Sequence, residues 1–351
     1  MIIHLDLSVA ELDRLVGPRF GERLSELLRA HRLGNHLVVF DRVVGRWIDE
    51  HVELSSPMRA TATRIAHDYT QTGDLVRRCS DYIRVIARPE GTVRRAGRAI
   101  EMSFDELTSP YVLDRVALVV EDLESDGKLY DFLCRNLRDR LRAPPLAWEI
   151  FHGGGERTAL VARHKVDDRR IVSVVADSDL YWPSRDISAK HATLIRVVPE
   201  QDWPLYFVFT PPCREAENLL PWRTVALLPS AVQRISSLDV ALKIHEAESE
   251  ADVLCHQRCW LHLDLKEGFV LEKLPEDARE WIAAQLGHAR ISLEEFEFEG
   301  FGDRIFAQVF ANGAILAVLR DEIRTREWWE MFGEFVTRLT WIGAGGPRQF
   351  T

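Results

Sequence analysis

Acidic residues follow two apolar segments of this sequence, and each segment is typical of a buried strand. The first segment, residues 116–120, leads into Glu121, and the second, residues 171–176, leads into Asp177 and Asp179. Ligands bind beyond the carboxyl ends of the strands in an open α/β sheet, so we expect these acids to share one crevice. Three carboxylates in one crevice favour Mg²⁺ or Mn²⁺, because hard divalent cations take oxygen ligands.

The surroundings of each acid allow an alternative explanation. The run that Glu121 begins holds four carboxylates, those of Glu121, Asp122, Glu124 and Asp126. Their mutual repulsion is relieved best by a cation or by full solvation. The period of two along an extended chain places Asp177 and Asp179 on the same side, as metal binding needs. An acid at a strand exit is also an ordinary helix cap, and an Asp-x-Asp pair often arises by chance.

A glycine run, Gly153 to Gly155, lies between a predicted strand (148–151) and a predicted helix (157–164). Glycine lets backbone N–H groups approach an anion, and a helix N-terminus adds a favourable dipole, so this turn is a candidate phosphate contact. The run lacks the Gly-Lys-Ser or Gly-Lys-Thr of a P-loop and the spacing of a dinucleotide site. A tight strand-to-helix turn is the alternative.

Another polar segment follows the predicted strand 205–209. Residues 214–220 are predicted to form a helix that begins with Arg214, Glu215 and Glu217 and includes Asn218. Acids in a first turn complement the helix dipole and need no catalytic role. Whether these residues belong to a functional site therefore depends on the other motifs.

Four of these motifs, in this order, resemble the Toprim domain of the overcoming-lysogenization-defect (OLD) nuclease group. They are residues 119–121 with Asp126 and Tyr130, the turn 153–155, residues 174–179 and residues 214–218. The chain is especially similar, over residues 113–225, to the OLD-like Toprim effectors of bacterial anti-phage systems of the PARIS type. Asp122 departs from the family, which has glycine there, and the step from Glu121 to Asp126 is longer than in the family.

The resemblance implies a site. It assigns metal binding to Glu121, Asp126, Asp177, Asp179 and Glu217, and substrate contacts to Gly153, Gly154, Gly155, Arg214 and Asn218. Glu121 would also act in acid/base chemistry. Residues 260–268 resemble a lysine-bearing segment that follows the Toprim core of these effectors. Lys266 would offer a point charge to the scissile phosphate, and an ordinary surface lysine is the alternative.

Other patterns carry weaker signals. The acids Asp6, Asp41, Asp49 and Glu50 faintly resemble a PIN-type nuclease core, although strand-end aspartates are common helix caps. A loop at 88–91 leads into Arg94, Arg95 and Arg98, a cationic stretch with few opposing charges, which predicts either a solvated loop or a phosphate contact.

Two further patterns concern metal-binding and aromatic residues. Cys255, Cys259 and His262, with His256 nearby, have loose zinc-like spacing but lack four clear ligands. The tryptophans Trp328, Trp329 and Trp341 are expected to pack in a helical core rather than to stack on bases.

The elements that would position these residues form three regions. Residues 1–112 predict an N-terminal α/β or helical module, with a strand at 2–7, one long helix at 8–32 and a strand at 36–40. Residues 113–235 alternate strand and helix, which predicts a Toprim-like core: a mainly parallel sheet with helices on both faces. Residues 236–351 predict a helix-rich C-terminal domain, with helices at 240–248, 276–286 and 320–340.

Composition narrows the class of protein. The 351 residues exceed one average domain. No apolar run is long enough for a membrane helix, and residues 1–6 lack a signal-peptide pattern, so we expect a cytoplasmic protein. Five scattered cysteines predict reduced thiols rather than a disulfide scaffold. A net charge of -10 argues against a surface that is basic throughout, but leaves room for a local nucleic-acid site.

The sequence therefore predicts a Mg²⁺- or Mn²⁺-dependent nuclease of DNA or RNA, including tRNA, acting in anti-phage defence. The first alternative is a non-catalytic, Toprim-like binding or regulatory subunit that docks on an ATPase partner. Phosphoryl or nucleotidyl transfer to a small substrate is another, since it uses the same acids. The resemblance implies an ATPase partner of the SMC or ABC type, and a homo-oligomer is left open.

Overall fold

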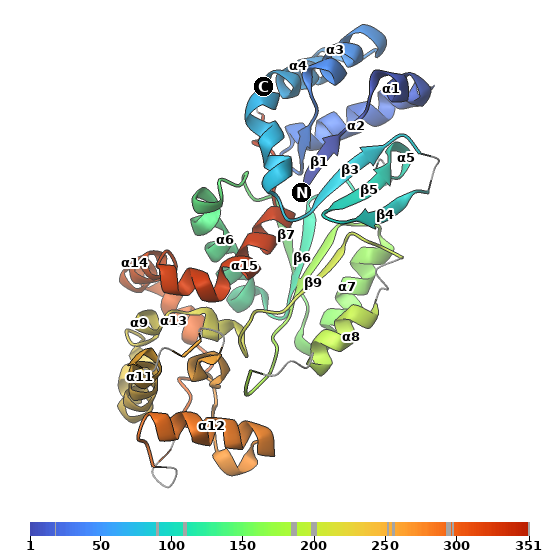
Figure 1. Ribbon diagram of the computed structural model, residues 1–351. Coiled ribbons are helices and arrows are strands. Elements are labelled where there is room, and N and C mark those ends of the chain that lie inside the picture. The colour runs from blue at the N-terminus through green and yellow to red at the C-terminus, as the bar shows by residue number, and fades with distance from the viewer. Residues whose placement is uncertain are drawn as a thin grey trace.

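The chain is an α/β protein, and the strands of its described part form three sheets (Figure 1). The computed structural model describes residues 1–17, 19–88, 91–107, 111–183, 188–197, 202–250, 253–254, 257–292, 296 and 298–349. Within them lie a five-stranded sheet, a four-stranded sheet and a two-stranded sheet. The general α/β prediction is confirmed.

The five-stranded sheet belongs to the N-terminal region. Its strands, in order across the sheet, are β2 (Leu37–Val39), β1 (Ile2–Leu5), β3 (Tyr82–Ile86), β5 (Ala99–Ser103) and β4 (Val93–Ala96). Only β4 is antiparallel to its neighbour among these pairs. The helices of this region are α1 (Val9–Leu15), α2 (Phe20–Arg32), α3 (Arg42–His51), α4 (Ser56–Arg78) and α5 (Phe104–Leu107). The single helix predicted at 8–32 is wrong, because the chain becomes extended at Val16 and Gly17 follows.

The arginine-rich stretch lies in and after β4 and is not a free cationic patch. Arg94 lies 2.6 Å from Glu101, and Arg95 lies 2.8 Å from Asp81. Arg98 donates to the backbone carbonyls of Arg77 and Cys79. Glu101 lies in the neighbouring strand β5 and Asp81 directly precedes β3, so the prediction of few opposing charges is wrong. Pro89 and Glu90 of the preceding loop lie outside the described residues.

The four-stranded sheet carries the candidate site. Its order is β7 (Trp148–His152), β6 (Val116–Val120), β8 (Val172–Val175) and β9 (Tyr206–Phe209), and each neighbouring pair is parallel. Every residue of β6 and β8 is buried, as expected for central strands covered on both faces.

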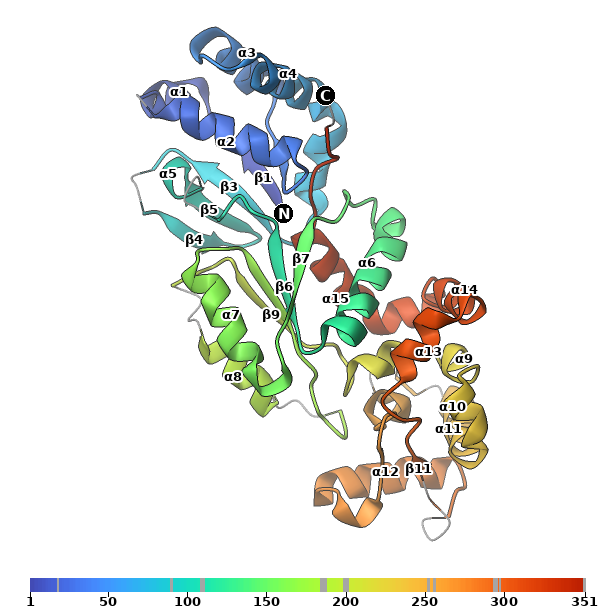
Figure 2. The same ribbon diagram turned by 180° about the vertical axis from the view of Figure 1, so that it is seen from behind.

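Helices cover both faces of this sheet, as predicted. On one face lie α7 (Thr158–Asp167) and α8 (Ala189–Val197), and on the other α6 (Lys128–Leu141) and α15 (Arg326–Ile342) (Figures 1 and 2). A π-helical turn at Leu123–Gly127 precedes α6, and a 3₁₀ turn at Gly155–Arg157 precedes α7. The sequence did not predict α8, and the helix predicted at 214–220 is only a 3₁₀ turn at Ala216–Leu219.

The chain that follows the four-stranded sheet is largely helical in its described part. Its elements are α9 (Trp222–Val225), α10 (Pro229–Gln233), α11 (Ile235–Glu250), η5 (Cys259–His262), β10 (Gly268–Phe269), η6 (Leu271–Lys273), α12 (Glu276–His288), β11 (Phe298–Glu299), α13 (Ile305–Ala311), α14 (Gly313–Glu322) and α15. The predicted helix 320–340 is interrupted between α14 and α15. Thr325 caps α15 there by accepting from the backbone N–H of Trp328.

The last helix returns to the core of the molecule. Along α15, Trp328 and Trp341 are each 2% exposed, which confirms the core packing predicted for them, and Trp329 is half-buried beneath Arg140. The segment after α15 passes beside the N-terminus (Figure 2). No helix among the described residues is long and apolar enough to cross a membrane.

Candidate active site

The ends of β6 and β8 place Glu121 beside Asp177. The two strands are parallel neighbours, with Val119 opposite Val174, so both chains leave the sheet at the same edge. The backbone N–H of Asp177 donates to Glu121 Oε1 across 3.1 Å. The convergence expected from the sequence therefore occurs.

Lys190, from α8, joins the acids of the two strand ends. Its Nζ lies 2.8 Å and 3.0 Å from the two carboxylate oxygens of Glu121, and 2.9 Å from Asp179 Oδ2. Burial lowers the pKa of Lys190, but the hydrogen bonds and charges of Glu121 and Asp179 outweigh it, so the pKa rises. Lys190 is therefore a fixed cation, and the sequence analysis missed it because no local pattern marks it.

Asp177 and Asp179 do not follow the expected alternation. β8 ends at Val175, and Asp179 adopts a left-handed conformation with φ +55°. Asp177 is buried, and its Oδ1 accepts from the backbone N–H of Ala216 at 3.0 Å, whereas Asp179 turns to Lys190. The period of two holds only while the chain stays extended, so this part of the prediction is wrong.

A second lysine-centred group lies close to the first. Lys266 Nζ is 3.3 Å from Glu215 Oε2 and 3.4 Å from Glu217 Oε2. Asp126 is buried, and its carboxylate accepts from the N–H of Asp122 and the hydroxyl of Ser125. The charges of Lys266 and Asp177 act on Asp126 as well, which links the two groups. Lys266 is therefore part of the cluster and not an ordinary surface lysine.

Burial makes these carboxylates hard to ionise together. Burial, followed by the charges of Asp126, Glu121 and Glu217, raises the pKa of the Asp177 carboxyl well above its usual value. Burial raises the pKa of Glu217 to about 7, although Lys266 opposes the shift. The pKa values of Asp126 and Glu215 are raised by burial too. An additional cation would favour the ionised forms of all of them.

Arg214 and Asn218 are engaged by the protein and hold the cluster in place. The Arg214 guanidinium lies 3.0 Å from Asp264 and 3.3 Å from Glu215, and it stacks 3.8 Å from the centre of the Tyr181 ring. The Asn218 side chain accepts from the N–H of Glu215 and donates to two backbone carbonyls, those of Trp260 and Leu263. Both side chains are buried and already bonded within the protein, and their role as substrate contacts stays a prediction.

The glycine run forms a tight strand-to-helix turn, which was the alternative to the predicted phosphate contact. The N–H of Gly153 donates to the carbonyl of Val120, and that of Gly154 to the carbonyl of Glu121. Gly154 and Gly155 have positive φ values. Because two of the N–H groups are already donated, the predicted phosphate cradle at Gly153 and Gly154 is not formed. The turn instead fixes the end of β6, where Glu121 emerges.

The weaker patterns do not form sites in the described residues. Asp41 caps α3 by accepting from the N–H of Val44, and Asp49 pairs with Arg59, so the faint PIN-like pattern has ordinary structural explanations. Cys259 is a buried free thiol. Cys255 and His256, which complete the zinc-like spacing, lie outside the described residues.

The cluster is rich in the ligands that Mg²⁺ prefers, but lysine nitrogens lie between its carboxylates. Its described residues comprise six carboxylates and two ammonium groups, from Glu121, Asp126, Asp177, Asp179, Glu215, Glu217, Lys190 and Lys266. In this arrangement no three His, Cys, Asp or Glu side chains of the described chain are grouped for one ion. Glu217 Oε2 is buried without a hydrogen bond and lies 3.4 Å from Lys266 Nζ, so a metal ion would compete with that ammonium group for it.

Comparison of the chain with known protein families, curated proteins and solved structures finds no match. The function must therefore be inferred from the residues of the cluster.

Proposed function

We propose that this chain is a metal-dependent nuclease with a Toprim-type core. The observation that carries the proposal is the meeting of acids from successive strand ends at one edge of a parallel sheet: Glu121 after β6, Asp177 after β8 and Glu217 after β9. Acids gathered beyond the carboxyl ends of parallel strands are positioned to act on a ligand in that crevice.

The donor set fits a hard divalent cation. Glu121, Asp177 and Asp179 would hold Mg²⁺ or Mn²⁺, with Asp126 and Glu217 completing the oxygen ligands. Bound there, the metal would neutralise the phosphate and lower the pKa of the attacking water. Glu121 is the group proposed to move the proton. Lys266 stays protonated, because the charges of Glu217 and Glu215 raise its pKa despite burial, and offers a fixed positive charge to the phosphate.

The resemblance to Toprim effectors supports a role in anti-phage defence and an ATPase partner of the SMC or ABC type. It leaves both DNA and RNA, including tRNA, as substrates. A partner would regulate the site rather than complete it, because the acids of the cluster all come from this chain.

The cleavage test uses total tRNA and plasmid DNA with Mg²⁺, Mn²⁺ or EDTA. Asp177→Asn keeps an oxygen for the N–H of Ala216 but removes the charge, so we expect a folded protein with at least a hundredfold loss of cleavage. Asp168→Asn, at the exposed end of α7, is the matched control and should cut normally. Unchanged cutting by Asp177→Asn would refute the assignment.

One observation favours a second candidate, a non-catalytic regulatory module. Lys190 already neutralises Glu121 and Asp179, which is how a site without metal would be stabilised. The two candidates differ in what happens when this ammonium group is removed.

The Lys190→Met variant separates the candidates without measuring activity. In a metal site, its loss leaves Glu121 and Asp179 without their cation, so Mg²⁺ should raise the melting temperature more than it does in the unmodified protein. Lys128→Met removes an exposed lysine that pairs with Glu124 and should respond to Mg²⁺ as the unmodified protein does. No effect of Mg²⁺ or Mn²⁺ on either protein would favour the non-catalytic module.

A further inference from the structure

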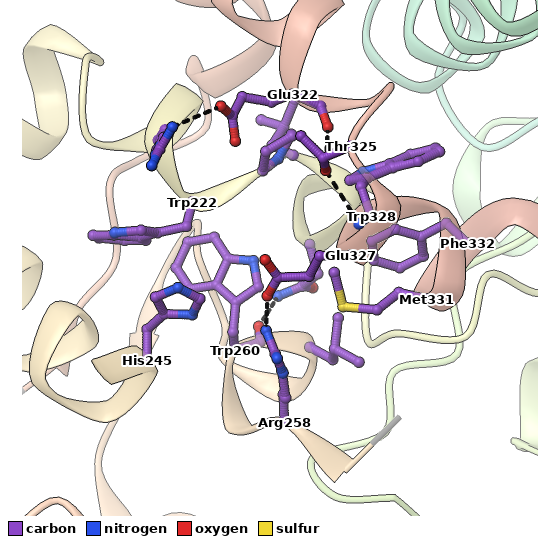
Figure 3. Close-up of a pocket in the computed structure, with 15 residues that line it drawn as sticks. Trp222, His245, Arg258, Trp260, Glu322, Thr325, Glu327, Trp328, Met331 and Phe332 are labelled. Carbon is purple, nitrogen blue, oxygen red and sulfur yellow. Dashed lines mark hydrogen bonds and ion pairs between the residues drawn. The ribbon is translucent and has the colours of Figure 1, made fainter. Parts of the chain in front are cut away.

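A cavity with aromatic walls lies directly beside the carboxylate cluster. It has a volume of about 220 Å³ and is bordered by α9, α11, η5 and the beginning of α15 (Figure 3). Asn218 lies between the two places: it lines the cavity while its side chain holds the backbone of Glu215. A ligand in the cavity would therefore be held next to the candidate active site.

The walls present aromatic ring faces. Trp222 and Trp260 meet edge to face, with ring centres 4.9 Å apart and planes at 80°, and His245 lies 6.4 Å from Trp222. Figure 3 shows these three rings on one side of the cavity and Glu322, Thr325 and Trp328 on the other. Aromatic faces of this kind stack on planar rings such as nucleobases, at about 1–3 kcal/mol for each base.

Two buried donors in the walls lack acceptors. The indole N–H of Trp260 and the Nε–H of Arg258 are buried and have no hydrogen-bond partner among the described residues. Trp260 as a whole is 7% exposed. Leaving such a donor unpaired costs about 1–3 kcal/mol, so a ligand that brought an acceptor atom would recover that cost. A nucleobase has carbonyl and ring-nitrogen acceptors in its plane.

The volume of the cavity and the charge of nearby Arg223 suit a single base that belongs to a longer nucleic acid. A volume of 220 Å³ is below the roughly 300–1,000 Å³ of sites that hold whole small molecules, so it suits one ring system. A second hollow of about 730 Å³ lies against the first and shares Trp222, Arg223, His245 and Glu322 with it. Arg223, which lines both hollows, is exposed and lies 3.2 Å from Glu322, so a phosphate would compete with that carboxylate for it.

We propose that this cavity binds an unpaired base of the nucleic-acid substrate, and thereby selects single-stranded or looped-out segments. The inference rests on the proposed nuclease function, because the cavity matters to catalysis only if the neighbouring cluster cuts the same strand. A base inside a duplex is stacked on both sides and must leave the helix to enter such a cavity. Blunt duplex DNA is therefore excluded from it.

The test measures binding with cleavage switched off. A labelled single-stranded RNA or DNA of ten nucleotides and a blunt duplex of the same sequence are titrated in EDTA, with fluorescence anisotropy as readout. The full-length protein should prefer the single strand, and Trp222→Leu should weaken that binding about tenfold. Trp222→Phe, which keeps a ring, should retain most of it. Trp329→Leu is the matched control, because Trp329 stacks under Arg140 outside the cavity and its loss should leave binding unchanged.

The remaining outcomes contradict either the base-binding role or the nuclease proposal. Equal binding by Trp222→Leu and the unmodified protein, a preference for the duplex, or no binding to either nucleic acid would each overturn the base-binding role. If binding depends on Trp222 but no metal supports cutting, the base-binding role stands and the nuclease proposal fails; if Asp177-dependent cutting occurs with unchanged binding by Trp222→Leu, the reverse holds.

Discussion

At the scale of single residues, the carboxylates of this protein are of two kinds: those paired with a lysine and those without one. Glu121 and Asp179 share Lys190, and Glu215 and Glu217 share Lys266. Glu248, on α11, has no such lysine: one oxygen accepts from the N–H of Cys259 and the other is buried without a hydrogen bond. Burial raises the pKa of Glu248 to about 7, against the effects of that hydrogen bond and of Arg258.

Glu248 gives a prediction for pH dependence. The native state keeps a proton on Glu248 that the unfolded chain releases above about pH 4.5, so its contribution to the free energy of unfolding falls as pH rises and is lost above pH 7. Glu248→Gln cannot titrate. Relative to the variant, the unmodified protein should lose roughly 3 kcal/mol between pH 4.5 and 8.

Urea unfolding of both proteins across this pH range measures that difference. Other titrating groups, including the buried His31 and His36, are common to the two proteins, so their effects cancel. A difference that does not change with pH would mean that Glu248 is ionised in the native state throughout.

At the scale of elements, short irregular turns place the acids. The turn 153–155 closes onto the end of β6, because Gly153 and Gly154 donate to the carbonyls of Val120 and Glu121. The 3₁₀ turn Ala216–Leu219 presents the N–H of Ala216 to Asp177. The strands bring the acids to one edge, and these turns set the direction in which each side chain leaves it.

Gly153→Ala tests the close approach at the first turn. An added Cβ would lie 2.7 Å from the Val120 carbonyl oxygen and 3.0 Å from Thr158 Cβ, so we expect a loss of about 1–3 kcal/mol in the free energy of unfolding. Gly287→Ala, in α12, meets no atom within 4 Å and should stabilise the protein by up to about 1 kcal/mol. Urea unfolding compares the two, and equal stabilities would show that the turn has room to adjust.

At the scale of the whole molecule, the segment after α15 ties the two large sheets together. The carbonyl of Ala344 accepts from the α-amino group of Met1, and the N–H of Gly345 donates to the carbonyl of Pro145. The N–H of Gln349 donates to the carbonyl of Arg32. Buried apolar residues from both sheets, among them Ile3 of β1 and Leu118 of β6, belong to one continuous core, so the sheets are not independent in their packing.

Gly345→Ala should weaken both sheets. The added Cβ would lie 2.3 Å from the Gly34 carbonyl oxygen and 2.4 Å from Ala147 Cβ, which belong to opposite sides of this junction. We expect a loss of about 1–3 kcal/mol and faster amide hydrogen exchange in both β1 and β7. Gly313→Ala, which meets no atom within 4 Å, is the control. Faster exchange confined to residues 344–349 would contradict a role in joining the sheets.

The sequence by itself determined the parallel core and the meeting of its acids. Continuous apolar runs such as 116–120 are typical of strands buried on both faces, and the carboxyl ends of parallel strands must lie at a common edge. The sequence alone therefore predicts that Glu121 and Asp177 lie close together. Asp126 belonged to the acidic run that begins at Glu121, whereas Glu217 could be added only through the resemblance to a family. The Asp-x-Asp geometry failed because nothing local shows where the extended chain stops.

Only the tertiary structure decided which of these groups are already paired. Lys190 reaches Glu121 from a helix 69 positions away. Arg94 and Arg95 form ion pairs with Glu101 and Asp81, which lie in or beside other strands. The amide of Asn218 donates both its hydrogens to backbone carbonyls of η5 and of the residue after it. The aromatic cavity likewise joins Trp222 to Trp260 and His245. Ion pairs and cavity walls depend on distances between side chains far apart along the chain, whereas strand burial is a local property that repeats within a few residues.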